Sequence, residues 1–296
     1  MIDSFSASAP QNTGDDRWNL LFRKAQASRA AHVFALFRDN GIEPILIKGF
    51  AAAVNYPVSV YRPSIDIDLA VSYVDFDQAE ALVGSPRAKG IGIDVHRELR
   101  HLDSVSWEDL FDNSRLIETD EGSIRVLRPE DHLRVLAIHW LTDGGSQPER
   151  LWDIYYAVEN RSPDFDWDRC LHVVEKHRRR WIVCAVGLAH KYLDLDLTDC
   201  PIGKEAQELP PWLIKTVERE WSTKTKHVPL ELAIYDPTAL SKQMIRRMRP
   251  NPIWATIQME GSFDAATRVH YQIANWLKRI APSYRRVSRA MRLSRK

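Results

Sequence analysis

The stretch LIKGFAAAVNYPVSVYRPSIDIDLAV, residues 46–71, contains the features that decide the fold of this chain. It continues a short apolar segment, EPILIKG (43–49), which predicts a strand that ends in a glycine. FAAAVNY (50–56) then predicts a short helix. SIDIDLAV (64–71) alternates apolar and acidic residues, as a half-buried strand does. A strand, a helix and a second strand in this order indicate an α/β unit.

Helices and strands continue to alternate on both sides of this stretch. Apolar residues recur at helical spacing from Asp15 to Asp39, and Gly41 follows where a glycine commonly ends a helix. DFDQAEALVG (75–84) predicts another helix, while GIGIDVHREL (90–99) and GSIRVL (122–127) predict two more strands. Up to residue 127 the sequence therefore predicts a compact α/β head.

The pattern changes after RPED (128–131), whose proline and acids suit the first turn of a helix. From there on apolar residues follow helical spacing, and we find no convincing strand. Helices are predicted at 147–160, 167–178, 180–194, 205–225, 236–248 and 264–280. The expected domains are a disordered lead-in (1–14), the head (15–127), an all-helical domain (128–280) and a basic tail (281–296).

The composition is that of an ordinary globular protein. The chain has 296 residues, 44% of them hydrophobic and 27% charged, and a formal net charge of +1 that selects no partner. Its three cysteines form no CxxC pair, which favours a reducing compartment. A polar N-terminus and the lack of an apolar run of about 18 residues predict neither a signal peptide nor a membrane span. We expect a cytoplasmic protein.

The basic residues concentrate at the C-terminal end, since no acid occurs from Arg268 to Lys296. Such a tail binds RNA, acidic lipid or an acidic partner by charge, or it is simply a solvated terminus. The sequence leaves both interpretations open.

The alternation in residues 64–71 places Asp66 and Asp68 on one face of a strand, with Cβ atoms roughly 6–7 Å apart. Two ionised carboxylates at this distance repel each other unless they share a proton or hold a cation. In the next predicted strand, Asp94 and His96 also lie on one face. If the two strands pair, three carboxylates share a surface, which suits two divalent ions, Mg²⁺ with Mn²⁺ as an alternative. The other interpretation is an exposed polar sheet face.

The residues before this strand suit the binding of phosphate groups. Gly49 lies where a strand turns into a helix, so that backbone N–H groups can approach an anion. Lys48 offers a point charge and Arg62 a planar guanidinium for a triphosphate. Alternatively, Lys48 is a lysine at a strand end and Gly49 only breaks the helix.

These motifs resemble the DNA-polymerase-β-like nucleotidyltransferase superfamily, and within it the bacterial uncharacterised nucleotidyltransferase family. The resemblance rests on Lys48-Gly49, Tyr56-Pro57, Arg62-Pro63, Asp66-x-Asp68 and the later Asp94-x-His96. It covers roughly residues 18–200. The chain differs in having Phe50 rather than Ser or Gly after Gly49, and in a longer gap between Gly49 and Asp66.

The resemblance implies a fold and a set of roles. The fold is an α/β (α+β) head with a mixed sheet, followed by an all-helical C-terminal domain. Asp66, Asp68 and Asp94 would bind two metal ions, Asp94 would help to deprotonate an acceptor hydroxyl, and Gly49 would help to hold the triphosphate of an NTP, ATP being the expected one.

The helical half contributes further candidates for the wall of a cleft: His139, Arg150 and Asp153, with His96 on the head. The family resemblance places a His on one helix and an Arg-x-x-Asp on the next. His139 could equally be a hydrogen-bonded core histidine. Arg150 and Asp153 could form a plain i,i+3 ion pair.

The expected activity is transfer of an NMP from an NTP to the hydroxyl of a small molecule, a peptide or RNA by a two-metal mechanism. Transfer of the γ-phosphoryl group by a kinase would use the same residues. A non-catalytic module that binds a nucleotide or a partner is the third hypothesis.

Overall fold

The computed structural model describes residues 16–99, 102, 104–223, 238 and 249–279. The lead-in predicted at 1–14, nearly all of the helix predicted at 236–248 and the basic tail predicted at 281–296 lie outside these residues. None of the described helices is long and apolar enough to cross a membrane. Internal contacts divide the chain into two compact units, Met1–His139 with Pro148–Gln207 and Trp140–Gln147 with Glu208–Lys296.

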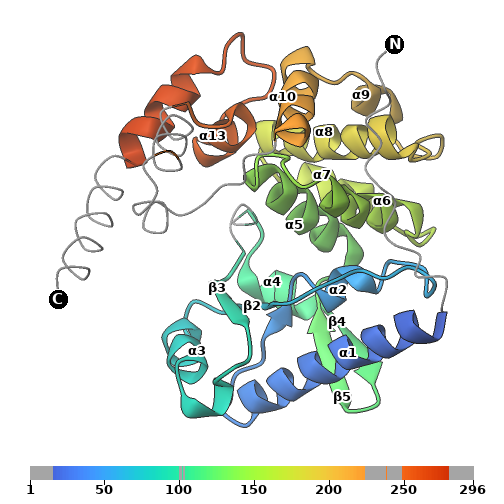
Figure 1. Cartoon of the computed structure of the whole chain (residues 1–296), viewed down its shortest axis with the longest axis vertical. Coiled ribbons are helices and arrows are strands. Elements are labelled where there is room, and N and C mark those ends of the chain that lie inside the picture. Colours follow the sequence, from blue (N-terminus) through green and yellow to red (C-terminus); the bar gives the residue numbers. More distant parts are fainter. Residues whose placement is uncertain (1–15, 100–101, 103, 224–237, 239–248, 280–296) are drawn as a thin grey trace. The chain divides into compact units, whose positions relative to one another are not determined.

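The first unit contains the mixed α/β head that the sequence predicts (Figure 1). Its elements are α1 (Asp16–Arg38), β1 (Ile45–Leu46), α2 (Phe50–Ala53), β2 (Ile67–Val71), α3 (Phe76–Val83), η1 (Pro86–Ala88), β3 (Ile93–Arg97), α4 (Trp107–Asp112), β4 (Arg115–Thr119) and β5 (Gly122–Val126). The sheet has the order β3-β2-β1-β5-β4. β2 pairs with β3 and β1 with β5 in parallel, whereas the β1–β2 and β4–β5 pairs are antiparallel.

The sequence prediction omitted three elements of the head, η1, α4 and β4. β4 is an edge strand, and its residues are exposed or half-buried. It therefore lacks the alternation of buried and exposed side chains by which the other strands were predicted.

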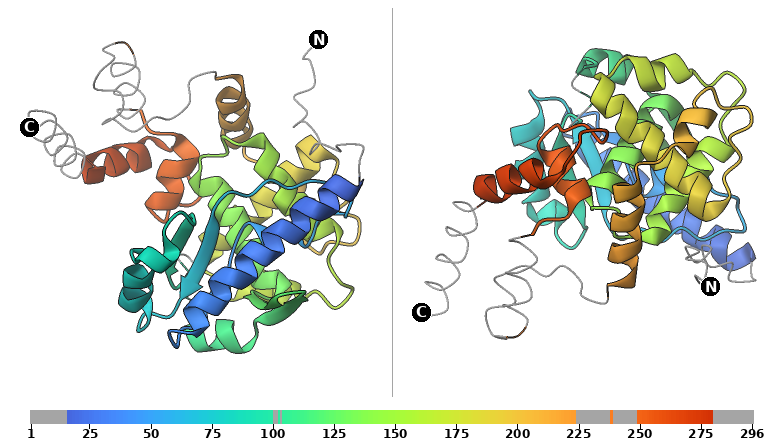
Figure 2. Two further views of the ribbon diagram at one scale, coloured as in Figure 1. Left: turned by 60° about the horizontal axis from the view of Figure 1, so that its bottom comes forward. Right: turned by 90° about the horizontal axis from the view of Figure 1, so that it is seen from above.

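Alternation along β2 separates the two faces of the sheet. Ile67, Leu69 and Val71 pack into a core with α1 and α3, and α1 crosses this face (Figure 2). Ala70 points to the opposite face, where it joins a second core with Leu110 of α4. Asp68 lies on this second face as well, because it alternates with Ile67 and Leu69.

The polar side of α1 holds the long segment that joins α2 to β2. Four side chains, spaced three or four residues apart along α1, donate hydrogen bonds to backbone carbonyls of this segment. The bonds run from Asn19 to Ser59 (2.6 Å), from Arg23 to Val54 and Tyr56 (3.1 Å each), from Gln26 to Arg62 (3.0 Å) and from Arg29 to Ile65 (2.5 Å). The segment that leads into β2 is thus tied to a helix across its length.

Only helices follow the head among the described residues, as predicted. They are α5 (Pro129–Thr142), η2 (Pro148–Arg150), α6 (Leu151–Glu159), α7 (Trp167–His172), α8 (Lys176–Leu193), α9 (Gly203–Gln207), α10 (Pro211–Ser222), α13 (Pro252–Gln258) and a helical segment at 269–279. The helix predicted at 205–225 is in fact two, because Pro210 and Pro211 interrupt it. The helix predicted at 180–194 begins earlier, at Lys176, and α13 was not predicted.

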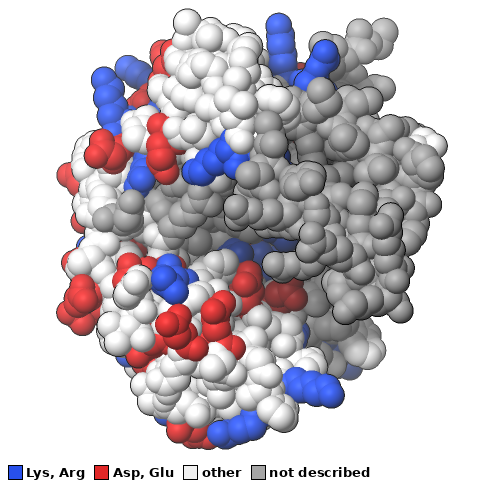
Figure 3. Space-filling view, turned by 90° about the vertical axis from the view of Figure 1, so that its left-hand side faces the viewer, with Lys and Arg blue, Asp and Glu red and all other residues white. Residues whose placement is uncertain are grey.

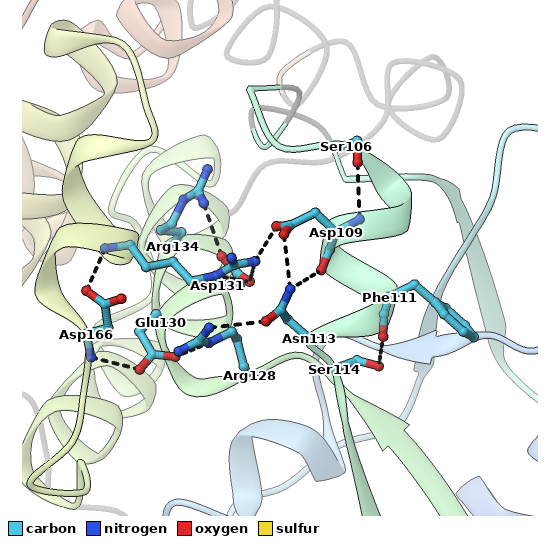
Figure 4. Close-up of polar contacts among 11 residues, drawn as sticks. Ser106, Asp109, Phe111, Asn113, Ser114, Arg128, Glu130, Asp131, Arg134 and Asp166 are labelled. Carbon is cyan, nitrogen blue, oxygen red and sulfur yellow. Dashed lines mark hydrogen bonds and ion pairs between the residues drawn. The ribbon is translucent and has the colours of Figure 1, made fainter.

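Buried ion pairs join the head to the helices of the first unit (Figure 4). Asp131 on α5 and Arg134 one turn later are fully buried and paired at 3.1 Å. Arg169 of α7 binds Asp131 at 2.8 Å and Asp109 of α4 at 2.7 Å. Because α4 belongs to the head, this network makes one charged junction of three helices.

In the second unit, hydrogen bonds hold the short connection that follows α5. The Trp140 indole donates to the carbonyl of Gln147 at 2.8 Å. Asn251 caps α13 through Trp254 N–H (3.1 Å) and donates to the carbonyl of Gly144 (2.9 Å). These bonds satisfy backbone groups that a turn and a helix end leave open.

Candidate functional site

Parallel pairing of β2 and β3 brings two of the predicted carboxylates together. Asp68 is directly opposite Asp94 in the register of the two strands. His96, two residues beyond Asp94, lies on the same face because side chains alternate along a strand. The pairing that the sequence analysis could only assume is therefore present.

Asp68, Asp94 and His96 form a group in which each offers a ligand atom within 4.8 Å of the others. His96 Nε2 lies 3.3 Å from Asp68 Oδ1 and 3.4 Å from Asp94 Oδ2. Two carboxylates and an imidazole are a donor set that a divalent cation accepts. The residues present thus fit a divalent cation.

Lys48 supplies a positive charge to the same group. Its Nζ lies 2.5 Å from Asp68 Oδ1, and both side chains are largely buried. Burial alone would raise the pKa of Asp68, but the hydrogen bond from His96 and the charge and hydrogen bond of Lys48 lower it to about 2. Asp68 is therefore ionised throughout the neutral range.

Gly49 adopts a backbone conformation that other residues rarely take, with φ 66° and ψ −118°. A Cβ there would lie 2.7 Å from Ser64 Oγ and 3.4 Å from the carbonyl oxygen of Asp66. The turn after β1 consequently packs against the residues that lead into β2. Its role in holding a triphosphate stays a prediction.

Asp66 lies outside the group formed by Asp68, Asp94 and His96. β2 begins at Ile67, Asp66 occupies a bend before it, and the neighbouring Ile65 is 79% exposed rather than buried as predicted. The alternation predicted over 64–71 is therefore wrong at its first residues. Asp66 Oδ1 lies beside Gly92, at 2.8 Å from where a Cβ would be. That Asp66 binds metal stays a prediction.

Arg62 forms a buried clamp with Asp153 of α6. Its Nε donates to Asp153 Oδ1 at 2.9 Å and its second terminal nitrogen to Oδ2 at 2.7 Å, while the Tyr56 hydroxyl donates to Oδ1 at 2.7 Å. Burial would raise the pKa of Asp153, but the Arg62 charge and these hydrogen bonds bring it below its ordinary value. The guanidinium fork predicted for phosphate is thus engaged by a carboxylate, and its nucleotide-binding role stays a prediction.

Two neutral histidines of α5 border this region. His132 Nε2 donates to the carbonyl of Ile47 at 3.1 Å, and burial lowers its pKa to about 4. His139 Nε2 accepts from Arg150 at 2.6 Å. Burial first, and then the charges of Lys48 and Arg150, lower the pKa of His139 to about 3. The positive charge of Lys48 thus acts on His139, which in turn accepts a hydrogen bond from Arg150.

Charge gathers on the side of the head where α3 and β3 lie in Figure 1. Figure 3 views this side and shows acidic side chains clustered in its lower half, with basic side chains next to them. Asp94 is 64% exposed and His96 36%. The acidic group is accordingly reachable from solvent at its β3 edge.

Sequence reasoning missed two residues of this region, Tyr56 and His132. Tyr56 enters the sequence analysis only as part of the Tyr56-Pro57 motif, and His132 does not enter it. Both act through partners distant in sequence, Asp153 and Ile47, which no local pattern indicates.

The geometry agrees with a comparison of the chain with known protein families. A model of the uncharacterised nucleotidyltransferase family matches residues 15–194, which include the head, the acidic group and helices α5 to α8. No curated protein and no solved structure shows a significant match. The match spans more than half of the chain, and the chain therefore belongs to the uncharacterised nucleotidyltransferase family.

Proposed function

We propose that this protein transfers a nucleoside monophosphate from an NTP, ATP being the expected donor, to the hydroxyl group of an acceptor. The observation that carries the proposal is the group of Asp68, Asp94 and His96 on adjacent parallel strands, beside the ammonium of Lys48. Family membership supports the reaction class.

The acids would hold divalent cations of the Mg²⁺ or Mn²⁺ kind, with Asp66 completing the ligands of a second ion. Such cations neutralise the charge of the phosphates and of the oxygens that attack and leave. Carboxylate oxygens are the ligands that these ions prefer.

The side chains of the chain have separable roles. Lys48 and the Gly49 turn bind the triphosphate, and Arg150, oriented by neutral His139, adds a second cation beside it. The acceptor oxygen bonds to the α-phosphorus as the bond to the bridging oxygen breaks and pyrophosphate leaves. Asp94, the most exposed acid of the group, receives the hydroxyl proton.

Labelled ATP tests the reaction class. Label at the α position entering an acceptor supports nucleotidyl transfer. Label from the γ position instead would establish the kinase alternative, and binding of ATP without transfer to any of a small-molecule, peptide or RNA acceptor panel would favour the binding module.

Asp68→Asn tests the site. The variant is expected to lose transfer by at least about a thousandfold, because several kcal/mol of charge stabilisation depend on this carboxylate. Asp120→Asn is the matched control, since Asp120 is 84% exposed in the β4–β5 turn and pairs with Lys24. Equal turnover in wild type and Asp68→Asn, with unchanged unfolding, would contradict the proposal.

A further inference from the structure

His96 Nε2 lies beside one oxygen of each of the two acids. Its Nε2 faces Asp68 Oδ1 at 3.3 Å and Asp94 Oδ2 at 3.4 Å. Both oxygens carry only lone pairs, and so does Nε2 when that nitrogen bears no proton. Asp68 Oδ1 also contacts the ammonium of Lys48, and the contacts of Nε2 are favourable when this nitrogen carries a proton or when a metal cation lies between it and the two oxygens.

The spacing of these atoms matches the ligands of a small divalent ion. Ligands about 2.1 Å from an ion lie roughly 3.0 Å apart at the corners of an octahedron and roughly 3.4 Å apart at those of a tetrahedron. Both distances from Nε2 fall within or next to this interval. The two distances from Nε2 are therefore those expected between neighbouring ligands of one ion, and the ligand atoms of all three residues lie within 4.8 Å of one another.

We propose that His96 is a direct metal ligand and that it makes this position selective for a first-row transition-metal ion, such as Mn²⁺, over Mg²⁺. The inference rests on the proposed function and deepens it. Mg²⁺ demands oxygen ligands and retains its water, whereas imidazole suits transition metals and carboxylates suit Mn²⁺. A set of one nitrogen and two carboxylate oxygens thus favours Mn²⁺, and an all-oxygen position that includes Asp66 remains suited to Mg²⁺.

A purely structural role for His96 makes a different prediction. If the ring only donated a hydrogen bond to orient Asp68, its nitrogen would not touch the ion, and its loss would weaken Mn²⁺ and Mg²⁺ binding alike. The ratio of the two dissociation constants therefore separates the two roles, as does direct detection of a bound nitrogen.

The experiment loads the full chain with Mn²⁺ alone, without nucleotide. Free Mn²⁺ is measured by electron paramagnetic resonance, Mg²⁺ affinity is obtained by competition, and pulsed resonance detects the ¹⁴N of a coordinated imidazole. His96→Gln is compared with wild type. His172→Gln is the matched control, because His172 also contacts an aspartate, Asp168, at 2.9 Å, but on the exposed surface of α7.

We expect ¹⁴N coupling in wild type and in His172→Gln, and its loss in His96→Gln. Mn²⁺ affinity should fall at least about tenfold in His96→Gln, while Mg²⁺ affinity changes less than about threefold. Mn²⁺ bound without ¹⁴N coupling, or an equal loss of affinity for both ions, would overturn the proposal.

Failure of this inference is distinguishable from failure of the proposed function. Labelled transfer that depends on Asp68, in a protein whose Mn²⁺ shows no nitrogen coupling, overturns only the role of His96. Nitrogen-coordinated Mn²⁺ in a protein that transfers no label leaves the metal assignment supported and overturns the transferase.

Discussion

At the scale of single residues, the Asp68 oxygen that is proposed to bind a metal ion already contacts the ammonium of Lys48. Lys48 Nζ lies 2.5 Å from Asp68 Oδ1, and His96 contacts the same oxygen at 3.3 Å. A metal ion bound at that oxygen must compete with the lysine. The ammonium that would bind phosphate therefore also limits metal binding before the nucleotide arrives.

Lys48→Met should consequently change two measurements in opposite directions. Mn²⁺ affinity without nucleotide is expected to rise about tenfold, because a charge a few ångströms away is removed. Nucleotidyl transfer should fall, because the phosphates lose that charge. Calorimetric titration and the α-label assay measure the two. Lys24→Met, which removes the exposed partner of Asp120, should change neither measurement. A weaker Mn²⁺ affinity in Lys48→Met would refute competition between Lys48 and the metal ion for Asp68.

Gly49 and Gly41 distinguish two energetic costs of adding a side chain, backbone strain and steric contact. Both have positive φ, 66° and 76°, but a Cβ at Gly41 would meet nothing within 4 Å, whereas one at Gly49 would lie 2.7 Å from Ser64 Oγ. Gly41→Ala should cost about 1 kcal/mol of unfolding free energy, and Gly49→Ala about 2–3 kcal/mol. Urea unfolding measures both. Adding Ser64→Ala should recover part of the Gly49→Ala loss, and equal costs at the two glycines would show that the contact is unimportant.

At the scale of elements, the segment between α2 and β2 is held from two sides. Side chains of α1 donate hydrogen bonds to the backbone of this segment. Asp153 of α6 binds Tyr56 and Arg62, which lie toward the start and toward the end of the segment. The same segment contacts the Gly49 turn through Ser64. A helix of the second half thereby positions a loop of the head, which in turn positions the start of β2.

Asp153→Asn tests this clamp. Removing one member of a buried pair leaves the other charge uncompensated, so we expect a loss of about 3–5 kcal/mol in unfolding free energy. The double variant with Arg62→Met should lose less than the sum of the two single variants. Asp168→Asn, at an aspartate whose side chain is 85% exposed, serves as control. A loss below about 1 kcal/mol in Asp153→Asn would argue against the clamp.

At the scale of the whole molecule, the head and the helices up to α9 belong to one compact unit. Asp131, Arg169 and Asp109 join α5, α7 and α4, and His132 of α5 binds the end of β1. The division into separate domains at residue 127 stays a prediction. These contacts make the stability of the first unit depend on groups buried at its junction.

Acid should destabilise the protein through His132. Its pKa is about 4 in the folded chain and about 6.5 when unfolded, so the unfolded chain binds the proton first as the pH falls. The stability is complete above pH 6.5 and declines by about 3 kcal/mol as the pH falls to about 4. Urea unfolding from pH 7.5 to 4.5 should show a shallower decline in His132→Gln. Parallel curves of unfolding free energy against pH for wild type and His132→Gln would exclude protonation of His132 as the cause.

The sequence by itself determined which residues share a face of the sheet. Strand alternation depends on local backbone geometry, so Asp68, Asp94 and His96 could be placed in phase, and the helical second half followed from local periodicity. The same reasoning failed at Ile65, where the strand had not yet begun. It also missed β4, because an exposed edge strand leaves little apolar pattern.

Only the tertiary structure decided which partner each charged group found. Arg62 binds Asp153 of α6, and His96 rather than Asp66 joins the two opposed acids. The His96 contacts depend on strand register, and Arg62 and Asp153 are 91 residues apart in the sequence. Local spacing encodes neither. The alternating acids thus predicted a cation site, and the pairing of β2 with β3 brought an imidazole beside the two acids.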